Sequence, residues 1–121
     1  MISPGPATRV FLALGATDMR KGFEGLAGLV RAQLGEEPLS GHLFVFSNAA
    51  RTRVKILFWD GSGLWVCGKR LERGRFCWPT LEQGKEPGAK LRLSNAELAM
   101  LLGGLDFGLT RKRKWWRCNE L

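Results

Sequence analysis

The chain has 121 residues, with 19 Lys and Arg against 11 Asp and Glu, and a formal net charge of +8. Hydrophobic residues make up 45% and charged residues 25%, ordinary values that exclude a globally disordered chain. No apolar run approaches the ~20 residues that cross a bilayer, and the first residues lack the pattern of a signal peptide. The positive charge favours nucleic acid or another polyanion as a partner.

Cysteine usage bears on the compartment. There are three cysteines, an odd number with no closely spaced pair, which favours reduced thiols. We therefore expect a cytoplasmic protein that does not contact a membrane.

The first part of the chain predicts a strand, a helix and a second strand. Arg9–Leu14 is a short, mostly apolar run that favours a buried strand. Thr17 or Asp18 is expected to cap a helix over about Met19–Leu34, in which apolar residues recur with a period near 3.6. His42–Phe46 is expected to form the second strand.

The central stretch Arg51–Pro79 predicts a β-hairpin around Asp60-Gly61-Ser62-Gly63. If the loop consists of Gly61, Ser62 and Gly63, Gly63 takes the left-handed conformation. Counting outward from that loop pairs Asp60 with Leu64, Trp59 with Trp65, Leu57 with Cys67, Lys55 with Lys69, and Arg51 with Arg73.

This register predicts one basic face and one apolar face. The basic face would carry Arg51, Arg53, Lys55, Lys69 and Arg73, with Trp59 and Trp65 near the turn. The apolar face would carry Val54, Ile56, Phe58, Leu64 and Val66. Lys55 opposite Lys69 is a like-charge pair that an anion such as a phosphate backbone would relieve. The alternative is a solvated basic face, and a loop of two residues would shift the pairing by one.

After the hairpin, the sequence predicts smaller elements. Arg75–Trp78 is an extended run, and Lys90–Leu93 is a short extended piece. Ser94 and Glu97 have the spacing of a capping box, which predicts a helix over Ala96–Leu102. The expected fold is α+β: a mostly antiparallel sheet of four to six strands, one longer helix packed on it, a short C-terminal helix and a basic flexible tail. Residues 1–108 would form a single domain and residues 109–121 the tail.

The tail contains the run RKRKWWR from Arg111 to Arg117. Its tryptophans could stack on unpaired bases while its cations contact phosphates. The alternatives are a solubilising end, or a peptide whose tryptophans bind a protein groove. The full set of candidate nucleic-acid-binding residues is Arg51, Arg53, Lys55, Trp59, Trp65, Lys69, Arg70, Arg73, Arg75, Arg111, Lys112, Arg113, Lys114, Trp115, Trp116 and Arg117.

Catalytic and metal sites find little support in the residue types. The three aspartates each have a local structural role, as a helix cap, a turn residue and a post-helix loop residue (Asp18, Asp60, Asp106). The cysteines and the single histidine lack the paired spacing of zinc ligands (Cys67, Cys77, Cys118, His42). A Cys nucleophile with a His base stays open, although nothing favours it. We expect no enzymatic activity, no metal and no cofactor.

Five segments together resemble a known family. They are TDMRKGFEGL (Thr17–Leu26), SGHLFVFSN (Ser40–Asn48), RVKILFWDGSGLWV (Arg53–Val66), KRLERGRFCWP (Lys69–Pro79) and LAMLLGGLDF (Leu98–Phe107). They are similar to the TnpB accessory proteins of bacterial insertion sequences of the IS-sixty-six group, and the resemblance runs from about Met1 to Trp116. It implies a protein that is encoded beside a separate DDE-type transposase and assists transposition, with no assigned catalytic residues.

The sequence therefore predicts a non-enzymatic accessory protein for DNA transposition. We expect it to bind DNA, the element's transposase, or both, through the basic hairpin face and the tail. Two alternatives stay open: a pure protein adaptor of the transposase that never touches DNA, and an RNA-binding regulator.

Overall fold

The computed structural model describes residues 7–79 and 90–103, and these residues form one five-stranded sheet with helices on both faces. The elements in chain order are β1 (Val10–Ala16), α1 (Phe23–Leu29), η1 (Val30–Leu34), η2 (Pro38–Ser40), β2 (Leu43–Ser47), β3 (Arg53–Trp59), β4 (Leu64–Arg70), β5 (Lys90–Leu93) and α2 (Asn95–Leu102). The strand order across the sheet is β4-β3-β2-β1-β5, so β4 and β5 are its edges.

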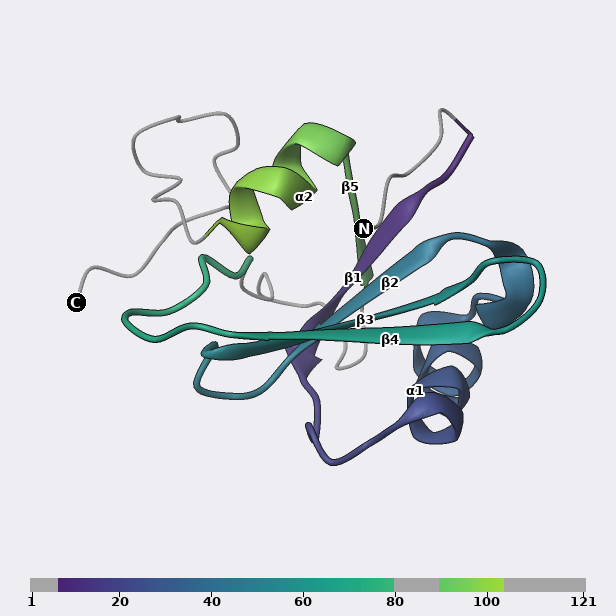
Figure 1. The fold of residues 1–121 in the computed structure, drawn as a ribbon, viewed down its shortest axis with the longest axis horizontal. Coiled ribbons are helices and arrows are strands. Elements are labelled where there is room, and N and C mark those ends of the chain that lie inside the picture. Colours follow the sequence, from purple (N-terminus) through teal and green to yellow (C-terminus); the bar gives the residue numbers. More distant parts are fainter. Residues whose placement is uncertain (1–6, 80–89, 104–121) are drawn as a thin grey trace.

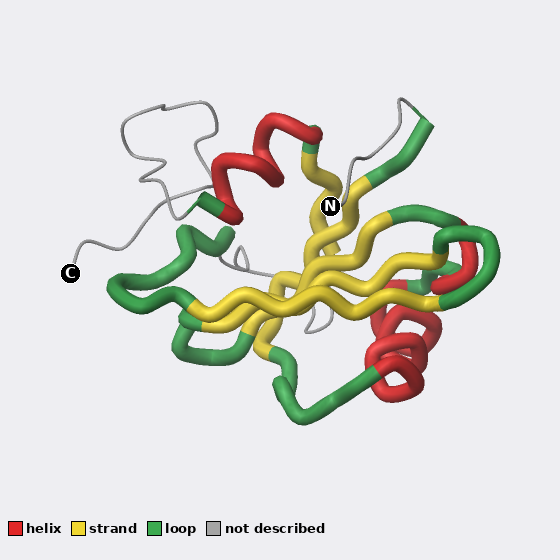
Figure 2. Tube along the Cα trace, in the orientation of Figure 1, coloured by secondary structure: helices red, strands yellow, loops and turns green. Residues whose placement is uncertain are grey.

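The two helices lie on opposite sides of the sheet (Figures 1 and 2). On one side α1 and η1 bury Leu26, Val30 and Leu34 against sheet residues such as Phe44 and Leu57. On the other side α2 buries residues including Leu101. Residues 76–78, which follow the hairpin, are also buried on the α2 side. Because both faces of the central strands are covered, β2 is buried along its whole length.

The predicted α+β class and the mostly antiparallel sheet of four to six strands are confirmed. Strand β1 pairs with β5 in antiparallel fashion, and β2–β3 and β3–β4 are also antiparallel. Strands β1 and β2 run parallel, because the chain crosses over through α1 and η1 between them. Lys90–Leu93 forms β5, an edge strand beside β1, whereas Arg75–Trp78 is not a strand of the sheet.

The first helix begins later than predicted, and the predicted cap is wrong. Gly22 occupies the N-cap position, and no side chain caps the helix. Asp18 instead closes a preceding turn, in which its Oδ1 accepts the backbone N–H of Arg20 at 2.9 Å. The helix continues as the π-helical η1 and ends at Gly35, which has φ of 64°. A glycine suits that left-handed position because it has no Cβ.

The predicted hairpin register is wrong by one residue. Trp59 lies opposite Leu64, and Lys55 lies opposite Gly68 rather than Lys69. The loop is short: the N–H of Asp60 donates to the carbonyl of Gly63 at 3.1 Å. Gly61, not Gly63, has positive φ, at 101°. A two-residue turn of Gly61 and Ser62, with glycine first, fits this geometry.

The predicted capping box is confirmed. The Ser94 hydroxyl accepts the N–H of Glu97 at 3.1 Å, and the Glu97 carboxylate accepts the N–H of Ser94 at 2.8 Å. This reciprocal pair fixes the start of α2 at the end of β5. The predicted tail, 109–121, lies outside the described residues, as does the predicted boundary at 108.

Two sequence expectations concern the compartment. Cys67 carries a free thiol, whereas Cys77 is disulfide-bonded, so the expectation of reduced thiols fails at Cys77. Among the described helices, none has the length and apolar character needed to span a bilayer.

Candidate nucleic-acid interface

In the observed register, the cations of the hairpin lie on both sides of the sheet and not on one face as predicted. Arg53, Lys55 and Arg70 share the α1 side with Leu57 and Val66, which belong to that core. Lys69 points to the α2 side, the side on which Val54 and Ile56 are buried. Side chains alternate along a strand, so a shift of one residue moves a whole strand's pattern to the other face. The predicted basic face is therefore wrong in its composition.

A different like-charge pair takes the place of the predicted one. Arg53 lies directly opposite Arg70 at the open end of the hairpin, and both side chains are exposed. One carboxylate approaches them: Glu72 Oε2 lies 3.8 Å from Arg70 Nη2, and both side chains of that pair are largely in solvent. Two guanidinium groups on facing positions repel each other. An anion between the two groups would relieve this repulsion.

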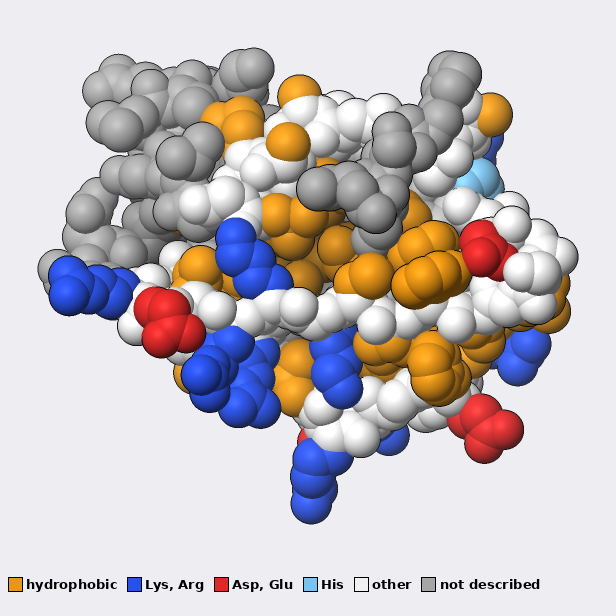
Figure 3. Space-filling model, viewed as in Figure 1, with side chains coloured by type: hydrophobic (Ala, Val, Ile, Leu, Met, Phe, Trp, Pro, Cys, Tyr) orange, Lys and Arg blue, Asp and Glu red, His pale blue; other side chains and the backbone are white. Residues whose placement is uncertain are grey.

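The two arginines line a groove. An open pocket of about 330 Å³ is bounded by Met19, Arg53, Val54, Lys55, Gly68, Lys69 and Arg70. Gly68 has no side chain to fill the space opposite Lys55. Figure 3 shows Lys and Arg side chains gathered around the end of β4 far from the turn, with hydrophobic side chains toward the turn. We call the surface formed by Arg53, Lys55, Gly68 and Arg70 the arginine groove.

Lys55 and Lys69 are each engaged with backbone carbonyls. Lys55 Nζ donates to the carbonyl of Met19 at 2.6 Å and to that of Lys21 at 2.9 Å. Lys69 Nζ donates to the carbonyl of Leu102, at the end of α2, at 2.6 Å. Lys55 therefore ties the hairpin to the segment that precedes α1, and Lys69 ties it to the end of α2.

Arg51 has a structural position. Its guanidinium donates to the carbonyl of Leu14 at 3.2 Å and to that of Asn48 at 3.3 Å. The same group lies 5.3 Å from the centroid of the Trp78 ring, a cation–π contact. Burial lowers the pKa of Arg51 from its usual value. Arg51 is thus not brought together with Arg53 and Arg70.

The two tryptophans of the hairpin lie on different faces. Trp59 is half-buried and shares its face with Leu57, whereas Trp65 lies opposite Phe58 on the other face. Trp65 is 52% exposed and stacks on Phe58, with ring centroids 6.0 Å apart. Its indole Nε1 donates to Asp60 Oδ2 at 2.7 Å, and this bond, with N–H bonds from the turn, holds the pKa of Asp60 well below its usual value.

The remaining predicted residues fall into two groups. Arg73 and Arg75 are exposed in the segment that follows β4. The basic run Arg111–Arg117 lies outside the described residues. Of the predicted set, the structure brings Arg53, Lys55 and Arg70 to one face of the hairpin, where they line one pocket. Lys69 also borders this pocket, but its side chain lies on the other face.

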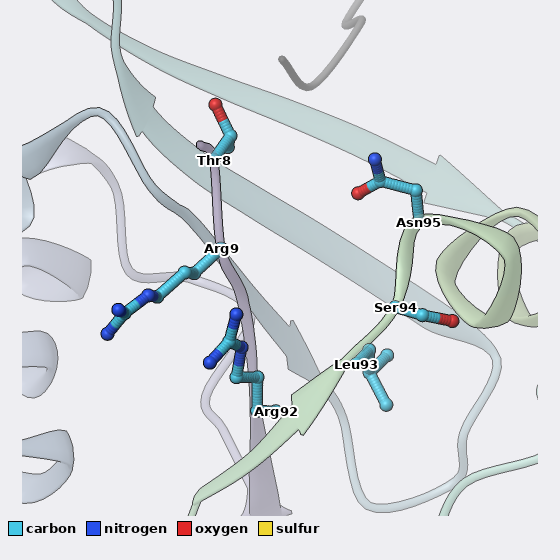
Figure 4. A pocket seen from close by; sticks show the side chains of 6 residues that line it. All are labelled: Thr8, Arg9, Arg92, Leu93, Ser94 and Asn95. Atoms are coloured by element: carbon cyan, nitrogen blue, oxygen red, sulfur yellow. The ribbon is translucent and has the colours of Figure 1, made fainter. Parts of the chain in front are cut away.

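A second pair of arginines was missed by sequence reasoning. Arg9, just before β1, and Arg92, in β5, line an open pocket of about 500 Å³ with Thr8, Leu93, Ser94 and Asn95. Figure 4 shows both arginine side chains extending to one side of the two strands, whereas Leu93 and Ser94 point to the other. Neither arginine forms an ion pair with a carboxylate of the described residues. Only the β1–β5 pairing brings them together.

Acidic side chains do not converge in the described part of the chain. No three His, Cys, Asp or Glu side chains there form a group that could hold a metal ion. Asp18 accepts hydrogen bonds from Arg20, and this contact lowers its pKa to about 2. His42 accepts the N–H of Arg9 at Nδ1, 2.9 Å away. These groups serve local structure.

The chain is similar to known proteins along nearly its whole length. The family described as IS66 Orf2-like protein matches residues 8–112. The uncharacterized protein y4hO of Sinorhizobium fredii (strain NBRC 101917 / NGR234) is 40% identical over 121 residues, covering 100% of this chain and 99% of the relative. The uncharacterized protein y4jC of the same strain is 34% identical over 113 residues, covering 93% and 92%. No solved structure matches the chain significantly.

Proposed function

We propose that this chain, which belongs to the IS66 Orf2-like protein family, is a non-enzymatic accessory protein that binds duplex DNA during transposition. The family implies a transposition-associated accessory protein. The proposal adds the partner and the surface: DNA phosphates lie across the arginine groove. The net charge of +8 supports a polyanionic partner in general.

One observation carries the proposal: Arg53 faces Arg70 across an antiparallel pair. A duplex backbone offers phosphates that each guanidinium can bind with two parallel hydrogen bonds. Binding would replace repulsion between two cations by attraction to a shared anion. Because the groove is open and the arginines are exposed, the phosphates can enter without a change in the fold.

The tail extends the same proposal. Arg111–Arg117 holds five cations and two tryptophans in seven residues, and we assign it a second contact with the same DNA. Phosphate contacts release counterions, so each one adds about 0.9 to the slope of log affinity against log salt. Variants of the groove and of the tail are each expected to lower this slope, so the contribution of each surface can be measured separately.

The test is a mobility-shift series over several salt concentrations, with duplex DNA from the element's ends, random duplex and RNA. Arg53→Gln with Arg70→Gln is expected to lower the salt slope by about 2. Deletion from Arg111 is expected to lower it further. The control is Arg31→Gln, which removes a cation that is already paired with Glu37 at 3.5 Å on η1.

The outcomes separate the partner classes. Unchanged DNA affinity in the double variant would overturn the role of the groove. If the wild-type chain retains neither DNA nor RNA but captures purified transposase, the protein is an adaptor whose basic surface meets an acidic one. Preference for RNA over both duplexes would favour the RNA-binding alternative.

A further inference from the structure

Among the described residues, strand β4 leaves one side of its backbone without a neighbouring strand. It is a seven-residue edge strand, Leu64–Arg70, and pairs only with β3 among the described strands. It lies at the front of the view in Figure 1, and Figure 3 shows its backbone uncovered on that side. An edge of this length exposes N–H and C=O groups that can pair with a further strand.

The hydrogen bonds of the hairpin decide which groups point outward. The N–H of Leu71 donates to the carbonyl of Thr52 at 2.9 Å, and the carbonyl of Gly63 accepts the N–H of Asp60 at 3.1 Å. Odd-numbered residues of β4 therefore pair with β3, since bonding alternates along an antiparallel strand. The outward N–H and C=O groups belong to the even-numbered residues, which are Leu64, Val66, Gly68 and Arg70.

We infer that β4 is a homodimer interface, at which β4 of a second copy pairs with it antiparallel around a two-fold axis at Cys67. Only even-numbered residues can exchange hydrogen bonds across this edge. In this register Leu64 faces Arg70 of the second copy, and Val66 faces its Gly68. Cys67 faces its own counterpart in a pair without hydrogen bonds. The two sheets then form one sheet of ten strands.

The sequence of β4 favours this axis over its neighbours. An axis at Val66 or at Gly68 satisfies the same alternation but pairs only five of the seven residues. With the axis at Cys67, all seven residues are paired. In this register no cation lies opposite a cation of the second copy. Lys69 lies opposite Trp65 of the second copy, whose exposed ring can form a cation–π contact with the ammonium group, and Arg70 lies opposite Leu64. This self-complementarity is why a second copy, rather than an unrelated strand, is the proposed occupant.

The dimer gives the proposed DNA-binding surface a symmetric form. The two-fold axis is perpendicular to the sheet, so both arginine grooves lie on the same face. The two Arg70 residues would be separated by six residues of strand, about 20 Å. This consequence rests on the proposed function, whereas the strand pairing itself does not.

The pairing is tested by removing one outward N–H. Gly68→Pro deletes the N–H that would donate to the second copy and leaves the β3 bonds intact, because proline is tolerated at an outward position of an edge strand. Gly68→Ala is the matched control, since an added Cβ meets no atom closer than the carbonyl oxygen of Val54 at 3.9 Å. Sedimentation of the full chain is measured with and without duplex DNA. Without DNA, wild type and Gly68→Ala are expected at twice the monomer mass, and Gly68→Pro at the monomer mass. With DNA, the mass of protein bound to the duplex is expected to show the same difference.

A second measurement covers the case in which Gly68→Pro fails to fold. In the pair without hydrogen bonds, the two Cys67 Cα atoms would lie about 4.5 Å apart, within the range that a disulfide spans. Mild oxidation of the wild-type chain with diamide is expected to give a Cys67–Cys67 peptide by mass spectrometry. Its absence, or a wild type that is monomeric with and without DNA, would overturn the dimer. A monomer that still shifts DNA through Arg53 and Arg70 would leave the proposed function standing.

Discussion

Arg53 and Arg70 face each other at the open end of the β3–β4 hairpin, and the nearest ion-pairing carboxylate in the described part of the chain is that of Glu72, 3.8 Å from Arg70. Directly opposed like charges destabilise a sheet by about 0.2–1 kcal/mol. The same pair is the centre of the proposed DNA contact. The two arginines are therefore expected to lower the stability of the free protein and to raise its affinity for DNA.

The first prediction follows from that opposition. Arg53→Gln is expected to raise the free energy of unfolding by up to about 1 kcal/mol while weakening DNA binding. Urea denaturation of the free chain and a mobility shift measure the two effects. The control is Arg31→Gln, which removes an ion-paired charge. If Arg53→Gln lowers both stability and DNA affinity, Arg53 stabilises the fold, and the predicted repulsion from Arg70 is contradicted.

The second prediction concerns Lys55. Lys55→Met keeps most of the aliphatic stem but leaves the carbonyls of Met19 and Lys21 without their donor. The expected cost is about 1–3 kcal/mol in the free energy of unfolding, because these carbonyls lie in a partly buried position. Lys69→Met is the comparison, and we expect a smaller loss there because Lys69 is exposed and water can replace it at Leu102. Equal losses in the two variants would contradict the buried character of the Lys55 contact.

The third prediction separates Arg51 from the DNA-binding set. Arg51→Met removes donors to the carbonyls of Leu14 and Asn48 and the contact with Trp78. We expect a loss of about 1–3 kcal/mol in stability. The salt slope of DNA binding should stay unchanged, since the guanidinium is used inside the fold. A slope lowered by about 1, with little change in stability, would return Arg51 to the interface.

The fourth prediction concerns acid stability. The Trp65 indole donates to Asp60, and the N–H groups of Ser62 and Gly63 donate to the same carboxylate. These bonds lower the pKa of Asp60 below its usual 3.8. A lowered pKa in the folded state contributes stability that is present above 3.8 and is lost as the pH falls below it.

Asp60→Asn should therefore lower the melting temperature at pH 7 and flatten its fall between about pH 5 and pH 2. Thermal melts followed by tryptophan fluorescence measure both effects. Glu24→Gln serves as the control, because Glu24 is exposed and makes no ion pair within the described residues. An acid transition as steep in Asp60→Asn as in the wild type would rule out this contribution.

The sequence by itself determined the elements whose signals are local. The spacing of Ser94 and Glu97 specified the start of α2, because a capping box satisfies backbone donors within one turn. The Asp60–Gly63 segment likewise located the hairpin, since glycine there permits the positive φ that a tight turn needs. The excess of Lys and Arg predicts a polyanionic partner, and that stays a prediction.

Only the tertiary structure decided which cations share a surface. The two-residue turn sets a register that differs by one residue from the predicted one. Because side chains alternate along a strand, Lys69 lies on the face opposite Lys55, and Arg70 lies across from Arg53. Arg51 and Lys55 donate hydrogen bonds to carbonyls that are distant in sequence, those of Leu14 and Met19 respectively. The pairing of β1 with β5 joined Arg9 and Arg92, residues that no local pattern connects.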